Sequence, residues 1–312
     1  MIKKFLILIA VVFTSFSFAQ QGSSSPYSFY GIGSLKFKGT VENQSMGGLS
    51  VYSDSIHINL RNPASYASEN LASPRFNGES RPVKYTVGGG FANLNLKSET
   101  SSAKASSATF NYLALSIPVG RFGVGFSILP QTAVGYKLEN LNDDGDLINQ
   151  YKGEGGLNKV NLGIGYLLAK GLSIGVDANY NFGNIQNNIV EYSYDADGLI
   201  LQYQSKEGNR SDLSGINFNL GLSYKTKINT NLELISGITY APQSNLTSNN
   251  QRIISTITIN SSTGTEFPVN SFEADLDAQG LKRTDLTMPS KLSFGAGIGK
   301  PRSWFVGAEY TA

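Results

Sequence analysis

The sequence contains no cysteine and only one histidine, His57, among its 312 residues. The absence of cysteine excludes disulfide bonds and thiolate chemistry, and a single histidine argues against a histidine-based metal site or a catalytic triad. Charged residues make up 15% of the chain, whereas roughly 25% is usual. No nucleophile or acid–base pair stands out, so the sequence predicts a protein that is not an enzyme and uses no metal or cofactor.

Long apolar segments are also missing, apart from the first residues. The opening "MIKKFLILIAVVFTSFSFAQQ" has two lysines, a short apolar run and the motif Ser17-Phe18-Ala19, which is typical of a signal peptide cleaved near Ala19. The run is shorter than the roughly 20 residues of a spanning helix. Removing residues 1–19 leaves 23 basic against 23 acidic residues. A neutral chain offers no basic surface, so no nucleic acid partner is expected.

Glycine and aromatic residues are abundant instead, with 34 glycines, 16 tyrosines and 17 phenylalanines. In "GLSIGVDANYNFGNI" and "GINFNLGLSYK", apolar residues alternate with Gly, Ser and Asn, which indicates strands with one apolar and one polar face. A soluble β-sandwich would alternate in the same way. The strands are much longer than the usual roughly 5–6 residues, however. We therefore expect an all-β protein, a transmembrane antiparallel β-barrel of the outer membrane.

The connections also alternate in length. Tight turns fall at 119–121, 169–171, 228–231 and 300–303, and long polar loops at about 138–158, 194–214 and 247–287. Outer-membrane barrels have short turns on the periplasmic side and long loops outside. The nine expected strands are 82–98, 106–118, 122–137, 158–168, 172–193, 215–227, 231–246, 288–299 and 303–312.

Nine is an odd number, and the last alternating run, "SWFVGAEYTA", is cut short. Because bacterial single-chain barrels have even strand numbers and no open edges, we expect the barrel to be incomplete at its C-terminus. The predicted organisation is a signal peptide (1–19), an N-terminal plug (20–81) and the barrel (82–312).

Four stretches resemble the FadL-type outer-membrane channels for hydrophobic compounds. They are "SSPYSFYGIGSLKFKGTVENQSMGGLSVYSDSIHINLRNPASYAS", "YLALSIPVGRFGVGFSILPQTAVGY", "YKGEGGLNKVNLGIGYLLAKGLSIGVDANYNFG" and "LTMPSKLSFGAGI" with "SWFVGAEY". The resemblance implies a fourteen-stranded barrel plugged by its own N-terminal segment. It also implies passive uptake of fatty acids or aromatic hydrocarbons, with lateral release where the third strand kinks inward.

Two prolines mark candidate gate residues. Pro130 lies inside the third expected strand, where a residue without an N–H indicates a bulge or an edge. A bulge that only curves the barrel and the lateral gap implied by the resemblance are both open. Asn62, Pro63 and Ala64 form a capped turn, because Pro suits the first helical position and Asn the cap. This turn is either a fixed plug contact or a movable gate.

Other candidates belong to the plug and the lumen. Tyr27, Phe29 and Tyr30 either line an apolar pocket or pack the plug against the barrel. Asp177, Glu233 and Glu309 fall at lumen-facing positions, where charges are expected as solvated or plug-anchoring groups. His57 is expected to be a packed or hydrogen-bonded residue.

The main functional hypothesis is therefore a passive channel for hydrophobic or amphipathic small molecules. The alternative is a structural or accessory barrel within a larger outer-membrane complex. The expected partners are the lipid bilayer and lipopolysaccharide, a hydrophobic small-molecule ligand in the first case, and outer-membrane proteins in the second. A transporter should show a continuous apolar tunnel, whereas an accessory barrel should have a blocked lumen.

Overall fold

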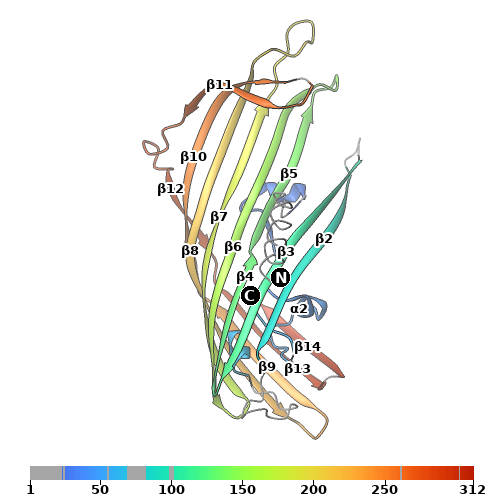
Figure 1. Cartoon of the computed structure of the whole chain (residues 1–312), viewed down its shortest axis with the longest axis vertical. Coiled ribbons are helices and arrows are strands. Elements are labelled where there is room, and N and C mark those ends of the chain that lie inside the picture. Colours follow the sequence, from blue (N-terminus) through green and yellow to red (C-terminus); the bar gives the residue numbers. More distant parts are fainter. Residues whose placement is uncertain are drawn as a thin grey trace, which may run out of the picture.

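The computed structural model describes residues 23, 25–54, 56–68, 82–97, 102–260, 262–301 and 303–312. Within these ranges the chain forms one antiparallel sheet of 14 strands (Figure 1). The predicted signal peptide and its cleavage site lie outside the described residues. No helix among the described residues is long and apolar enough to cross a membrane. The all-β antiparallel prediction is confirmed.

The described residues form mainly β-strands and only three short helical turns. The three helical turns are η1 (Pro26–Phe29), α2 (Val41–Ser45) and η2 (Pro63–Tyr66). The strands are β1 (Ser34–Leu35), β2 (Lys84–Lys97), β3 (Ser102–Val119), β4 (Phe122–Pro130), β5 (Thr132–Leu141), β6 (Leu147–Ala169), β7 (Leu172–Glu191), β8 (Gln204–Lys227), β9 (Glu233–Ala241), β10 (Ser244–Ile259), β11 (Glu266–Glu273), β12 (Arg283–Met288), β13 (Lys291–Lys300) and β14 (Trp304–Thr311).

The main path of the sheet runs β14-β13-β9-β8-β7-β6-β4-β3-β2. The long strands β6 and β8 each have two partners on one side: β4 and then β5 along β6, and β9 and then β10 along β8. In the described part of the chain, β2 pairs only with β3 and β14 only with β13. The sheet is therefore curved but not closed, and the predicted barrel architecture is not shown.

Prolines divide strands that the sequence predicts as continuous. Pro130 is the last residue of β4, Pro242 follows β9, and Pro289 follows β12. Because proline cannot donate to the ladder, a strand ends at or next to each of these positions. The expected strand 122–137 is therefore two strands, β4 and β5, and the expected strand 231–246 is divided between β9 and β10.

The tight turns lie where the sequence predicts them, at the end of the molecule that is lowest in Figure 1. Gly120 and Gly171, in the turns after β3 and β6, have φ of 58° and 75°, a conformation that favours glycine. The long loops, in contrast, are predicted wrongly. Strand β6 already begins at Leu147 and β8 at Gln204, and β10, β11 and β12 occupy most of 247–287. In 204–214, for example, almost every residue on both faces is polar, so the alternation signal is lost.

The face of the sheet that points away from the N-terminal segment carries an apolar band. On β7 it consists of Ile174, Val176, Tyr180 and Phe182, all exposed. The eight residue steps from Ile174 to Phe182 span about 26 Å, or about 20 Å after a tilt of roughly 40°, which is close to the height of the lipid-facing band of outer-membrane barrels, about 25 Å. Beyond Phe182 the same face carries Asn, Gln and Asn at 184, 186 and 188, so the band ends there.

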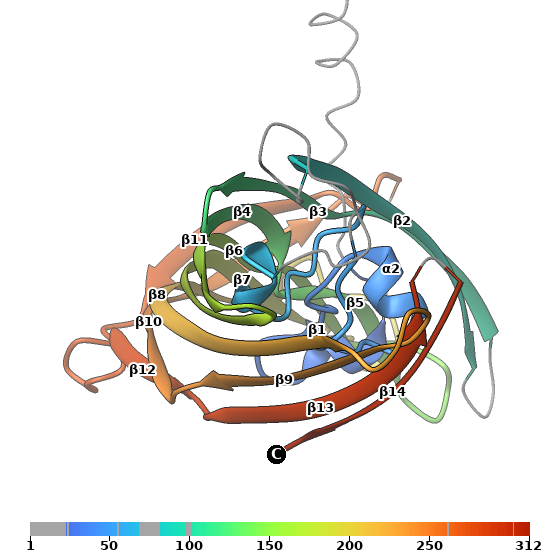
Figure 2. The same cartoon turned by 90° about the horizontal axis from the view of Figure 1, so that it is seen from below.

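The concave face encloses the N-terminal segment, which we define as described residues 25–68. Figure 2 shows it, in blue, inside the curve of the sheet. Two buried apolar clusters hold it there. One joins Ile58, Leu60 and Tyr66 to Ala114 of β3. The other lies on the long strands, around Val134, Tyr136, Leu157, Ile185, Leu213 and Leu246, with Ile32 of the segment packed against it.

Candidate functional site

The Asn62-Pro63 turn lies at the centre of the enclosed segment. Asn62 has an extended backbone and its side-chain Oδ1 accepts a hydrogen bond from the amide of Ala64 at 3.0 Å, so it caps η2. Its Nδ2 donates to the carbonyl of Leu222 in β8 at 3.0 Å. Asn62, Pro63 and Ala64 are all buried. One amide side chain thus shapes the turn and attaches it to the sheet.

The turn lies on a row of glycines that the sequence did not reveal. Gly123, Gly165, Gly175 and Gly221 are direct cross-strand neighbours on β4, β6, β7 and β8. A Cβ atom at any of them would overlap backbone or side-chain atoms of residues 62–67. We call this row the glycine floor. Only glycine permits so close an approach of two backbones, so the floor and the turn are complementary in shape.

Tyr66 extends the contact along the next row of the sheet. Its ring occupies the space that a Cβ at Gly125 or Gly163 would need, and it is 4% exposed. Burial raises the pKa of Tyr66 well above its usual range, and the nearby charge of Asp177 raises it further. The phenol therefore remains protonated and can act only as a neutral polar group.

Two of the three predicted lumen charges contact the N-terminal segment. Asp177 is fully buried, and its Oδ2 lies 3.7 Å from Nζ of Lys38. Burial lowers the pKa of Lys38, which the charge of Asp177 opposes. Glu309 accepts hydrogen bonds from the amide of Ser50 at 2.5 Å and from Nη2 of Arg61 at 3.3 Å. These contacts connect the segment to β7 and β14.

The third predicted charge, Glu233, is buried at the start of β9. Its partner is Lys225 of β8, with Nζ 3.3 Å from Oε2. This ion pair lies within the sheet wall. It borders a cavity beneath the segment, near the tight turns.

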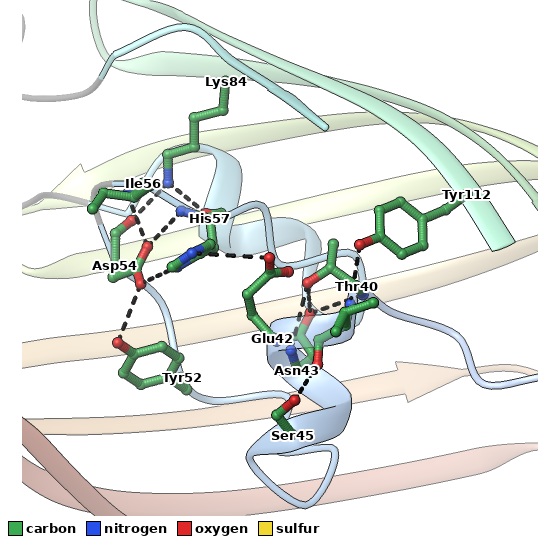
Figure 3. A network of polar contacts seen from close by, with 11 residues as sticks. Thr40, Glu42, Asn43, Ser45, Tyr52, Asp54, Ile56, His57, Lys84 and Tyr112 are labelled. Atoms are coloured by element: carbon green, nitrogen blue, oxygen red, sulfur yellow. Dashed lines mark hydrogen bonds and ion pairs between the residues drawn. The ribbon is translucent and has the colours of Figure 1, made fainter. Parts of the chain in front are cut away.

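A polar network around His57 attaches the segment to β2 (Figure 3). His57 Nδ1 lies 2.6 Å from Asp54 Oδ2, and Asp54 Oδ1 accepts the amides of Ile56 and His57. Lys84 of β2 donates to the carbonyls of Asp54 and His57 at 2.6 and 2.8 Å. Burial would raise the pKa of Asp54, but the hydrogen bonds from His57 and Ile56 outweigh it and the pKa is lowered.

The short helix α2 holds the segment against β3. Thr40 and Asn43 form a reciprocal cap at its first turn, which satisfies two otherwise unpaired amides. The amide of Val41 donates to the hydroxyl of Tyr112 at 3.1 Å. With the contacts above, β2, β3, β7, β8 and β14 all contribute polar attachments to one segment.

The predicted plug aromatics lie apart from these attachments, next to β5. The Phe29 ring contacts Tyr136 and Tyr151, with centroids 5.2 and 6.1 Å apart. Tyr27 and Tyr30 are 81% and 73% exposed. Only Phe29 therefore packs on the sheet, and the two tyrosines face away from it.

Pro130 lies where the sheet changes partners. Residues 113–119 of β3 pair with β4, where the last pair is Leu113 with Ile128. Residues 102–112 of β3 pair, in the described part of the chain, only with β2. Beyond Pro130, β5 pairs instead with β1 of the N-terminal segment, Ala133 opposite Ser34. A cavity of about 570 Å³ borders this break, beside Phe110 and Pro130. The segment thus supplies the neighbour that β3 does not provide.

The described residues contain no group of three or more His, Cys, Asp or Glu side chains that could hold a metal ion.

Comparison with solved structures gives a similarity to the RagAB peptide importer in its "closed-closed" state, with a TM-score of 0.34 and 11% identity. The match covers 73% of this chain and 30% of that chain, so the chain spans about a third of the length of that protein. No curated protein matches the sequence.

A family model does match, over residues 1–312, and it is that of BamG. This family is distinct from the FadL-type channels, so the resemblance drawn from the sequence is wrong. The uptake of fatty acids or aromatic hydrocarbons and lateral release at the third strand, which depend on it, are overturned as well. Outer-membrane association follows from the match and agrees with the β-rich fold. The chain belongs to the BamG family.

Proposed function

We propose that this protein is an accessory subunit of the β-barrel assembly machinery of the outer membrane. The observation that carries the proposal is the BamG match along the whole chain. The protein would act by binding neighbouring proteins and lipid, with no reaction catalysed and no small-molecule cargo.

The structure is compatible with this role because the concave side of the sheet is filled. Polar attachments from five strands and the glycine floor hold residues 25–68 in place. Removing such a segment would exchange these hydrogen bonds for bonds to water, at a net cost of about 0.5–1.5 kcal/mol each. A filled interior suits a structural subunit better than a conduit.

The outer surface would provide two kinds of contact. The apolar band on β6, β7 and β8 suits lipid, and polar strand extensions lie beyond it. Protein partners in the outer-membrane complex follow from the family. Contact of the outer part with lipopolysaccharide belongs to the same proposal, because it depends on the orientation inferred from the short turns.

Affinity purification of the tagged protein from native outer membranes, in mild detergent, tests the proposal. We expect the assembly machinery to co-purify in fixed stoichiometry, and depletion of the protein to lower the amounts of folded outer-membrane barrels. A barrel that purifies alone, with outer-membrane protein levels unchanged on depletion, would contradict the proposal.

A further inference from the structure

A cavity of about 470 Å³ lies under the N-terminal segment, at the end of the molecule that carries the tight turns. The segment forms one wall, from Met46 to His57. Strands β8, β9, β13 and β14 form the other. This volume falls within the range of small-ligand sites, roughly 300–1,000 Å³. The cavity belongs neither to the glycine floor nor to the break at Pro130.

One side of the cavity is formed by the ion pair of Lys225 and Glu233, in which one carboxylate oxygen has no hydrogen-bond donor among the described residues. Lys225 and Glu233 have side chains only 5% and 7% exposed, and the lysine is bonded to Oε2 of the glutamate. The other oxygen, Oε1, has no hydrogen-bond partner in the described part of the chain. A buried charged acceptor without a donor is costly. Glu233 lines the cavity, so a small rotation of its carboxylate toward the cavity would let a ligand N–H or O–H satisfy this oxygen.

The charge of that ligand follows from the neighbours. Lys225 already neutralises Glu233, and the Asp54 carboxylate opposite is engaged by His57 and Tyr52. The lining also includes Lys300, so two lysines stand against the carboxylates of Asp54 and Glu233. A further cation would meet the lysines and a further anion would meet the carboxylates. The donor is therefore expected to be uncharged, such as an amide or a hydroxyl.

The rest of the lining is mixed, with Ser53, His57, Lys300 and Ser303 beside a group of apolar side chains. Tyr52 and Phe305 are in ring contact, with centroids 5.0 Å apart, and Met46, Ile56, Ile235 and Trp304 belong to the same group. Aromatic walls favour a ligand with an aromatic or large aliphatic group, because burial of its apolar surface and contacts between rings stabilise the complex.

We propose that this cavity binds an uncharged group that combines an aromatic or large aliphatic body with one N–H or O–H donor to Glu233. In the accessory-subunit role, on which this part of the inference rests, the group is a residue of a partner polypeptide that inserts its side chain and offers its main-chain N–H. The short-turn end of the sheet would then be a protein-docking end.

The only tryptophan of the chain, Trp304, lines the cavity and reports on its occupancy. The full chain in lipid nanodiscs is titrated with N-acetyl-phenylalanine amide, and the Trp304 emission is recorded. Phenethylammonium and 3-phenylpropionate serve as charged probes of the same body. We expect a saturable emission shift with the neutral amide and a weaker one, or none, with either ion.

Two variants test the residues. Glu233→Gln should weaken binding of the amide about tenfold, as expected when a charged hydrogen-bond acceptor is replaced by a neutral one. Ser53→Phe, which leaves the ion pair intact and fills the cavity from the segment side, should abolish saturation. Glu191→Gln, at the far end of β7, is the control and should bind as the wild type does.

The inference is overturned if the neutral amide gives no saturable shift, if a charged probe binds as tightly, or if Ser53→Phe leaves binding unchanged. These results do not depend on the complex. If the machinery co-purifies but the titration fails, only the docking cavity is wrong. If the titration succeeds but nothing co-purifies, the ligand class stands and the subunit role falls.

Discussion

Replacing Gly175 by alanine should displace the Asn62-Pro63 turn from the sheet. A Cβ at Gly175 would lie 2.5 Å from the carbonyl carbon of Pro63 and 2.6 Å from the amide nitrogen of Ala64. Both are backbone atoms of a capped turn, so they cannot rotate away as a side chain does. Overpacking of this kind typically costs about 1–3 kcal/mol. A cost of about 2 kcal/mol would raise the population of the displaced segment roughly 30-fold.

Limited proteolysis of the full chain in lipid nanodiscs measures that population. Cleavage after Arg61, which is partly buried against the sheet, requires the segment to leave it. When opening is fast relative to cleavage, the rate follows the opened fraction. We expect Gly175→Ala to be cut at least tenfold faster than the wild type.

The control is Gly208→Ala, since a Cβ there meets only the side-chain oxygen of Asn188 within 3.5 Å. It tests whether any loss of glycine from a strand has the same effect. If Gly175→Ala is cut no faster than Gly208→Ala, the glycine floor does not hold the turn.

Three further results are expected. Asn62→Ala removes the cap of η2 and the bond to Leu222 and should destabilise the turn by about 1–2 kcal/mol; unchanged hydrogen exchange at Ala64 and Ser65 would count against it. Asp177→Asn breaks an ion pair whose carboxylate is fully buried and should lower the melting temperature clearly. Glu154→Gln breaks an exposed ion pair with Lys152 and should change stability by less than about 1 kcal/mol. Equal effects of the two substitutions would refute the role of burial. The pKa of Asp54 is lowered in the folded chain, so its contribution to stability is present above the unfolded value near 3.9 and is lost as pH falls through the lower folded value. Proteolysis of the 52–57 loop should therefore increase at low pH, and Asp54→Asn should remove this increase. The other charged or titratable groups near this carboxylate are Lys84, Glu42 and Tyr52. The reasoning is refuted if the variant retains the pH profile of the wild type.

The lower half of the sheet could be predicted from the sequence because two chemically different faces alternate there. Ile174, Val176 and Tyr180 point to one side and Ser173, Gly175 and Asp177 to the other, so period and length identify the strand. The tight turns follow from Gly and Asn at their ends. The upper half could not be predicted in this way. In "QSKEGNRSDLS" both faces are polar, and only backbone pairing with β7 and β10 reveals the strand.

The candidate site shows a different limit. The cap at Asn62 is a local property, and the Asn-Pro pair predicts it. The glycine floor is a property of register: Gly123, Gly165, Gly175 and Gly221 are far apart in sequence and become one row only when four strands align. The sequence does contain one signal of this floor, because each of the four strands has a glycine at a lumen-facing position. A water-filled lumen gives no reason for side chains to be absent there, so these glycines indicate close packing against another segment.

That signal also bears on the choice between a channel and a subunit. A conduit needs a lumen lined by side chains that tolerate a moving ligand, and its plug must be able to leave at moderate cost. Here the sheet has only glycines where the Asn62-Pro63 turn lies, and the turn packs directly against the backbone of the strands. Such complementarity gains nothing for passage of a ligand, because every displacement of the turn leaves an uncovered backbone surface. It suits the proposed subunit role, in which the outer surface and the cavity beneath the segment would contact neighbouring proteins.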